Sequence, residues 1–280
     1  MKKYVLPFLM FFSLFFLSCN SDMENRNYTI VFNSNGATGG VVPDAIKDIS
    51  ISDFFEMPSA ILIAKEGCSF VGWNLSQDGS GLMYGPHESC DVFEIANGEK
   101  NREIVFYAIW IPFDELFEFS YLKESDSYSV VGTKKNNIAA IYIPEEYKGK
   151  NVTTIGCAAF QESRVTEVMM PSITRISSKA FDGCGRLINV TFSSRLIHIG
   201  EWAFRNNSSL EQVFIPSSVR SFGNSWPFES AHSLEVINYG STKADWNKIK
   251  KGDYHFSGHW DHWDRFVVHC TDGWLTIDMV

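Results

Sequence analysis

Residues 176–204, ISSKAFDGCGRLINVTFSSRLIHIGEWAF, contain one complete repeat and the start of the next, and this repeat predicts the fold. An Ile-x-x-x-Ala-Phe anchor opens the stretch at residue 176 and returns at residue 199. Between the two anchors, residues 187–192 (LINVTF) alternate in the way that is typical of a short β-strand. A repeat of this length predicts stacked coils, each with one short strand and one turn or helical piece.

The same anchor occurs four times in the second half of the chain. Its copies are residues 155–160 (IGCAAF), 176–181 (ISSKAF), 199–204 (IGEWAF) and, with one extra residue, 222–228 (FGNSWPF). The intervals between their final residues, Phe160, Phe181, Phe204 and Phe228, are 21, 23 and 24 residues. Since no single coil can bury its own apolar face, we expect the coils to stack, with each of these Phe side chains filling a coil interior.

A strand-like element follows each anchor, and its alternation predicts a binding face. The copies are residues 165–171 (VTEVMMP), 187–192 (LINVTF), 210–216 (LEQVFIP) and 234–238 (LEVIN). If Val168, Val190 and Val213 point into the coils, their neighbours form two outward rows on the concave face. These candidate protein-binding residues are Glu167, Met169, Asn189, Thr191, Gln212, Phe214, Glu235 and Ile237. An apolar stripe with a polar rim is typical of a protein-binding surface, although a loop or the first half of the chain could equally cover it.

These repeats resemble the BspA-like leucine-rich repeat family of bacterial surface proteins. The resemblance covers roughly residues 138–272 and places the repeats at 138–240. Residues 143–156 are similar to the opening segment of that family, and residues 239–247 and 268–273 to its closing segment. The resemblance to the BspA-like family implies a leucine-rich-repeat solenoid. We expect residues 112–137 to form a connecting hairpin that caps the first coil, and residues 241–280 to form the C-terminal cap.

Residues 28–111 contain short β-rich runs separated by glycine-rich turns, with one short helix expected near residues 52–55. Four segments in order, residues 28–32 (YTIVF), 67–74 (GCSFVGWN), 78–81 (DGSG) and 107–110 (YAIW), resemble the internalin-type B repeat, also called the Listeria–Bacteroides repeat. That resemblance implies a small β-grasp-like module with a spacer or adhesive role and no catalytic residues. The predicted fold class is therefore mainly β, with a β-grasp-like module followed by the solenoid.

The N-terminus is typical of a secretory signal. Lys2 and Lys3 precede an apolar run that ends at residues 16–19 (FLSC), which resembles the bacterial lipobox. The resemblance implies a signal peptide at residues 1–18 and lipid attachment at Cys19, with residues 19–27 as a polar tether. A short uncleaved anchor is the alternative. We therefore expect a lipid-anchored cell-envelope protein, at the outer membrane and exposed at the cell surface.

Composition and motifs exclude several function classes. The 280 residues carry 24 Lys and Arg against 33 Asp and Glu, and this net charge of −9 argues against nucleic acid as a partner. No motif for a catalytic nucleophile, a nucleotide or a zinc protease occurs, so no enzyme activity and no cofactor are predicted. Cys68 and Cys90 share the first module and are candidates for a disulfide.

One chemically suggestive cluster lies near the C-terminus. It consists of His255, His259, His262 and His269 with Trp260 and Trp263. A zinc site needs four ligands in a familiar spacing, which this cluster lacks, so we predict no metal. The two indoles leave glycan binding open as an alternative function. The main hypothesis is a non-catalytic lipoprotein that recognises a host, matrix or envelope protein through the concave face of its repeats.

Overall fold

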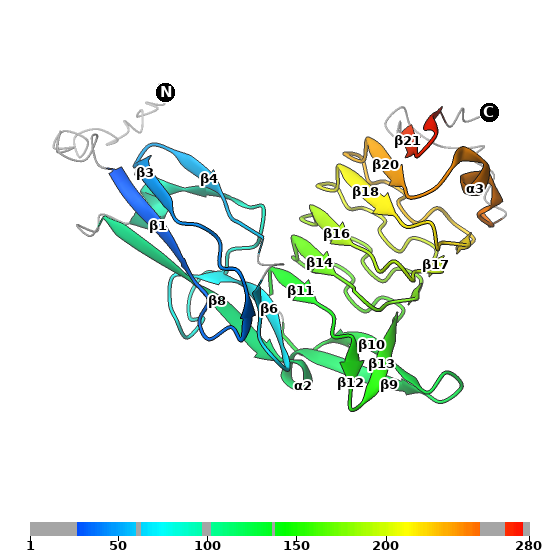
Figure 1. Ribbon diagram of the computed structural model, residues 1–280, viewed down its shortest axis with the longest axis horizontal. Helices are drawn as coiled ribbons and strands as arrows, with labels where there is room; N and C mark the ends of the chain where they lie inside the picture. Colours follow the sequence, from blue (N-terminus) through cyan, green and yellow to red (C-terminus); the bar gives the residue numbers. More distant parts are fainter. Residues whose placement is uncertain (1–26, 60–62, 97–101, 136–137, 253–266, 277–280) are drawn as a thin grey trace, which may run out of the picture.

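A computed structural model describes residues 27–59, 63–96, 102–135, 138–252 and 267–276. The chain is mainly β and forms two packed modules, which Figure 1 shows as the two arms of a V. The first module contains β1 (Asn27–Asn33), β2 (Gly39–Gly40), β3 (Ile46–Ser50), β4 (Phe54–Glu56), β5 (Ile63–Ala64), β6 (Cys68–Asn74), β7 (Ser89–Asp91), α1 (Val92–Ala96) and β8 (Glu103–Pro112).

The first module is built on a four-stranded sheet in the order β3-β1-β8-β6. β1 and β8 are parallel, and β6 runs antiparallel to β8. Alternating residues of β1, namely Tyr28, Ile30 and Phe32, are buried in the module's core. The prediction of a helix near residues 52–55 is wrong. Phe54–Glu56 instead forms strand β4, which pairs antiparallel with β7. The one helix of this module among the described residues is α1.

The second module begins with α2 (Phe113–Leu116), β9 (Phe117–Leu122) and β10 (Ser127–Thr133) and continues as a solenoid. Its remaining elements are β11 (Ala140–Tyr142), β12 (Glu146–Tyr147), β13 (Lys150–Ile155), β14 (Glu167–Met169), β15 (Arg175–Ile176), β16 (Asn189–Thr191), β17 (His198–Ile199), β18 (Gln212–Ile215), β19 (Ser221–Phe222), β20 (Val236–Tyr239), α3 (Lys243–Lys248), β21 (Val267–Cys270) and β22 (Gly273–Thr276).

Successive coils contribute short strands to two parallel ladders. The first ladder consists of two separate sheets, β11-β14-β16 and then β18-β20-β21, and the second is one sheet that contains β13, β15, β17 and β19. The antiparallel β9–β10 hairpin pairs with β13 and closes the start of the second ladder. The sequence predicted one strand per coil, whereas the structure adds a second, two-residue strand that ends on the first residue of each of the last three anchors.

The four anchor phenylalanines form a continuous stack through the solenoid core. Phe160, Phe181, Phe204 and Phe228 are buried, and successive ring centroids lie 5.0, 5.1 and 5.3 Å apart in near-parallel planes. Phe117, from the hairpin, meets the first ring edge-on at 6.4 Å. The prediction that these side chains fill the coil interiors is confirmed, and their stacking ties each coil to its neighbours.

The coils approach so closely that some positions accept only glycine. A Cβ on Gly223 would lie 2.1 Å from the backbone nitrogen of Glu201 in the preceding coil. Backbone bonds run across the same gap, as from the Phe204 N–H to the Pro227 carbonyl at 2.8 Å. Glycine at the second position of the anchor, as at Gly223, therefore allows the coils to approach to hydrogen-bonding distance.

Candidate functional site

The outward side chains of the first ladder form one row along the solenoid. Backbone register aligns Tyr142 with Met169 and Met169 with Thr191, and further along it aligns Phe214 with Asn238. Asn238 in turn pairs with His269, and His269 with Trp274. We call this set, Tyr142, Met169, Thr191, Phe214, Asn238, His269 and Trp274, the outward row. Figure 1 shows β14, β16, β18 and β20 following one another on the arm that carries it.

Two aromatic side chains make the outward row partly apolar. Phe214 and Trp274 each expose 57% of their surface. The Trp274 ring lies 4.3 Å from the His269 ring, centroid to centroid. Between β16, β18 and β20, residues such as Thr191, Gln212 and Phe214 line a shallow hollow of about 250 Å³. The outward row is therefore a long face with a shallow hollow rather than a deep pocket.

The eight residues predicted to point outward do not all do so. Thr191, Gln212 and Phe214 are exposed, while Met169 and Asn189 are half-buried on the same face. Glu235 is exposed but precedes β20, outside the ladder.

The outward placement of Ile237 is wrong. Ile237 pairs with Val213 and is fully buried. The outward residues of β20 are Val236 and Asn238, because a one-residue shift in a strand moves each side chain to the opposite face. The same parity rule, applied to residues 141–144 (IYIP), which repeat the strand pattern before the first anchor, would have identified Tyr142 as an outward residue.

Glu167 also departs from the prediction, because the first module covers it. Its side chain is only 4% exposed. Both of its carboxylate oxygens accept from the Ser59 hydroxyl at 2.9 Å, and one also accepts from the Asn189 amide at 3.0 Å. His87 Nε2 lies 3.5 Å from Glu167 Oε1, which is an ion-pair distance. Glu167 is therefore part of the contact between the modules.

His87 lies between two carboxylates at this contact. Its Nδ1 is 2.9 Å from Glu56 Oε1, and its Nε2 faces Glu167. The contact with Glu167 and then the hydrogen bond with Glu56 outweigh partial burial and raise the pKa of His87 to about 9. The imidazole is consequently charged at neutral pH and balances the buried Glu167 carboxylate.

Further bonds join the modules around this group. Arg186 of the solenoid pairs with Glu88 of the first module at 2.6 Å. The backbone N–H of Tyr142 donates to the Ser69 hydroxyl at 2.9 Å, and that of Ala139 donates to the Val71 carbonyl at 2.8 Å. Ala140 belongs to the core of the first module. The first module is thus docked on the first coil and covers that end of the outward face.

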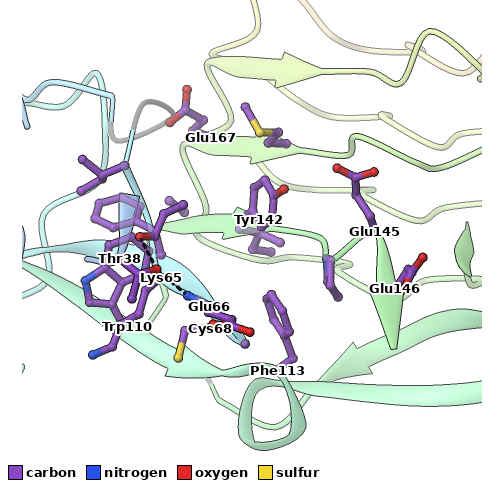
Figure 2. Close-up of a pocket in the computed structure, with 18 residues that line it drawn as sticks. Thr38, Lys65, Glu66, Cys68, Trp110, Phe113, Tyr142, Glu145, Glu146 and Glu167 are labelled. Carbon is purple, nitrogen blue, oxygen red and sulfur yellow. Dashed lines mark hydrogen bonds between the residues drawn. The ribbon is translucent and has the colours of Figure 1, made fainter. Parts of the chain in front are cut away.

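A cavity of about 520 Å³ lies between the modules beside this contact. Figure 2 shows Lys65, Cys68 and Trp110 on the first-module side and Tyr142, Glu145 and Glu146 on the solenoid side, with Phe113 between them. Tyr142 and Met169 line the cavity and also belong to the outward row. The cavity is therefore the N-terminal end of the same surface.

Comparison with protein families adds an independent observation. Residues 133–258 match the model described as "BspA type Leucine rich repeat region", in six copies. This part of the chain therefore matches the BspA-type leucine-rich repeat family. The matched residues include every anchor and strand on which the resemblance was based. No curated protein matches the chain.

Solved leucine-rich repeat structures resemble part of this chain. A leucine-rich repeat protein from T. pallidum is 18% identical with a TM-score of 0.41, covering 51% of this chain and 82% of that one. A second from Bacteroides capillosus is 28% identical with a TM-score of 0.40, covering 45% and 94%. A leucine-rich cell surface protein from Faecalibacterium prausnitzii is 22% identical with a TM-score of 0.40, covering 47% and 40%.

The family match does not extend to residues 28–111. Their likeness to an internalin-type B repeat stays a prediction. The prediction of a disulfide between Cys68 and Cys90 is wrong, because both thiols are free in the structure. Burial raises the pKa of Cys90 and of Cys184 to about 12, which keeps both thiols protonated at neutral pH.

Several other predicted features fall outside the described residues. These are Cys19, His255, His259, Trp260, His262 and Trp263. His269 is described, and its ring nitrogen contacts Asn238 at 3.3 Å. Within the described ranges, His, Cys, Asp and Glu side chains form no group of three or more that could hold a metal ion. The helices of that same part of the chain all lack the length and apolar character needed to cross a bilayer.

Proposed function

We propose that this chain is a non-catalytic, lipid-anchored protein of the cell envelope that recognises a protein partner through the outward row. The observation that carries the proposal is the exposure of Phe214 and Trp274, each at 57%, on a single continuous sheet face. Large aromatic side chains are enriched at protein interfaces, where they dominate the binding energy. Repeat proteins present such elongated faces for recognition.

The chemistry of the outward row favours a protein over a small molecule. Its aromatic residues are separated by Thr191 and Asn238, whose hydroxyl and amide groups both donate and accept hydrogen bonds. The hollow beside Phe214, at about 250 Å³, is smaller than the pockets that typically enclose a small ligand. A shallow face with aromatic anchors and neutral polar groups suits an extended or flat protein surface.

The proposed location rests on the N-terminal segment, whose residues 16–19 resemble a lipobox. Lipid attachment at Cys19 would hold the modules at an outer membrane. The proposed function there is adhesion to a host, matrix or neighbouring envelope protein. An acidic chain is repelled by anionic lipid, which supports an orientation away from the bilayer.

The test is a binding screen of host, matrix and envelope proteins with the full chain. Phe214→Glu and Met169→Lys place charges in the outward row, and we expect each to weaken binding by about tenfold or more. Ile197→Glu is the matched control, since Ile197 is 50% exposed beside β17 in the other ladder. Unchanged binding of Phe214→Glu to every partner found would refute the proposed face.

A further inference from the structure

We propose that the cavity between the modules binds an arginine or lysine side chain of an extended peptide segment that also lies along the outward row. The proposal rests on the proposed function, because it names the class of partner for the same face. Three features of the cavity carry it: aromatic walls held in place, carboxylates without partners, and an opening onto the outward row.

The aromatic walls come from both modules and are held by their own contacts. Trp110 donates its indole N–H to the Ser34 carbonyl at 2.9 Å, and Phe70 meets its ring edge-on at 5.8 Å. Phe113 stacks on Phe117 at 6.3 Å. Tyr142 lines the opposite side. Such ring faces attract a cation within about 6 Å, most strongly where the site is partly desolvated.

Carboxylates supply the complementary charge. Glu66, Glu145 and Glu146 line the cavity and are exposed. In the part of the chain that the structure describes, no ion pair neutralises any of the three. Burial raises the pKa of the Tyr142 hydroxyl, and the nearby charge of Glu145 raises it further. A cation that enters here therefore meets negative charge beside the ring faces.

The two remaining charged groups of the lining do not compete for a ligand. Glu167 is already engaged by Ser59, Asn189 and His87. The Lys65 ammonium lies 3.6 Å from the place a Cβ on Gly36 would take, and Gly36 does not line the cavity. The three unpaired carboxylates thus set the charge that the ligand experiences.

The size and shape of the cavity match a long basic side chain. Its volume of about 520 Å³ lies within the range of pockets that enclose a ligand. Apolar groups from Ile63, Pro144 and Met169 line it, and these can cover the methylene stem of Arg or Lys while the charged end meets the carboxylates. Since Tyr142 and Met169 continue into the outward row, the peptide backbone has a direct path along the sheet face.

The experiment presents the full chain, kept in mild detergent, with libraries of heptapeptides whose central residue is fixed. The centre is Arg, its uncharged analogue citrulline, or Glu, and the other positions are random. We expect the Arg library to be retained about tenfold or more over the citrulline library, and the Glu library to be excluded. Equal retention of Arg and citrulline would overturn the proposal.

Two double variants separate the cavity from the overall charge of the chain. The double variant Glu145→Gln with Glu146→Gln removes two cavity carboxylates. Among the described residues, neither carboxylate accepts a hydrogen bond that the fold would lose. We expect this variant to lose the preference for Arg. Glu94→Gln with Glu124→Gln removes the same charge from exposed positions away from the cavity lining and should keep the preference. Equal losses in the two variants would overturn the proposal by assigning the preference to net charge.

The result of the peptide experiment is independent of the test of the outward row by Phe214→Glu. If no library is retained, the cavity does not bind a basic side chain and the present inference is wrong. Phe214→Glu then still decides whether a protein partner binds the outward row. If Phe214→Glu changes no partner binding but the Arg preference persists, the cavity binds a basic side chain while the proposed function fails.

Discussion

The contact between His87 and Glu167 predicts a pH-dependent stability. Because the pKa of His87 is raised from 6.5 to about 9, protonation favours the folded, docked state. The contribution is fully present below the unfolded pKa and is lost as pH rises through the folded pKa. Linkage between these two values gives about 3 kcal/mol at pH 6, about 2 kcal/mol at pH 7.5 and about 0.2 kcal/mol at pH 9.5.

The substitution that exposes this effect is His87→Asn. His87 has a φ of 63°, and Asn tolerates this left-handed conformation better than other uncharged polar residues. Asn has no charge at any of these pH values. The difference in the free energy of unfolding between wild type and variant should therefore shrink as pH rises from 6 to 9.5.

The assay is urea unfolding of both proteins across this pH range, followed by tryptophan fluorescence. His198→Asn is the control of opposite sign, because burial and then the nearby Arg175 charge lower the pKa of His198. For that group the stabilisation by the native histidine falls as pH falls. A wild-type advantage over His87→Asn that stays constant, or grows with pH, would show that protonation of His87 does not stabilise the fold.

Three further predictions concern the solenoid. Phe181→Ala should destabilise the fold by about 3 to 5 kcal/mol in urea unfolding, whereas Phe214→Ala, which removes an exposed ring, should change it by less than about 0.5 kcal/mol. Gly223→Ala should destabilise by about 1 to 3 kcal/mol because its Cβ has no room, and a melting temperature within error of wild type would contradict this. Iodoacetamide at pH 8 should label the exposed Cys157 well before the buried Cys184, as mass spectrometry of the native protein can show.

The solenoid could be predicted from sequence because its determinants are local and repeated. Each anchor places a phenylalanine such as Phe181 in the coil interior, and the interval to the next copy fixes how the rings stack. Strand parity likewise assigned Phe214 to the outward face. It failed at Ile237, where the position was counted one residue out of register, and in a strand that error exchanges the two faces.

The contact between the modules could not be predicted in the same way. Glu167 has the same alternation as its exposed counterpart Gln212, so its pattern carries no sign of burial. Ser59 and His87, which cover it, lie 108 and 80 residues earlier in the chain. Their approach depends on how two folded modules pack. The cavity lined by Trp110 and Tyr142 exists only once that packing is formed.

The most direct test of the central claim is a photocrosslinking experiment on intact cells. Phe214 in the outward row, or Ile197 in the other ladder, is replaced with photoreactive benzoylphenylalanine in the full chain. Recognition through the outward row predicts a discrete crosslinked protein partner from position 214. Position 197 should not give this product, and excess purified wild-type chain should suppress it. Adducts of equal yield from both positions, or none from position 214, would contradict recognition through the outward row.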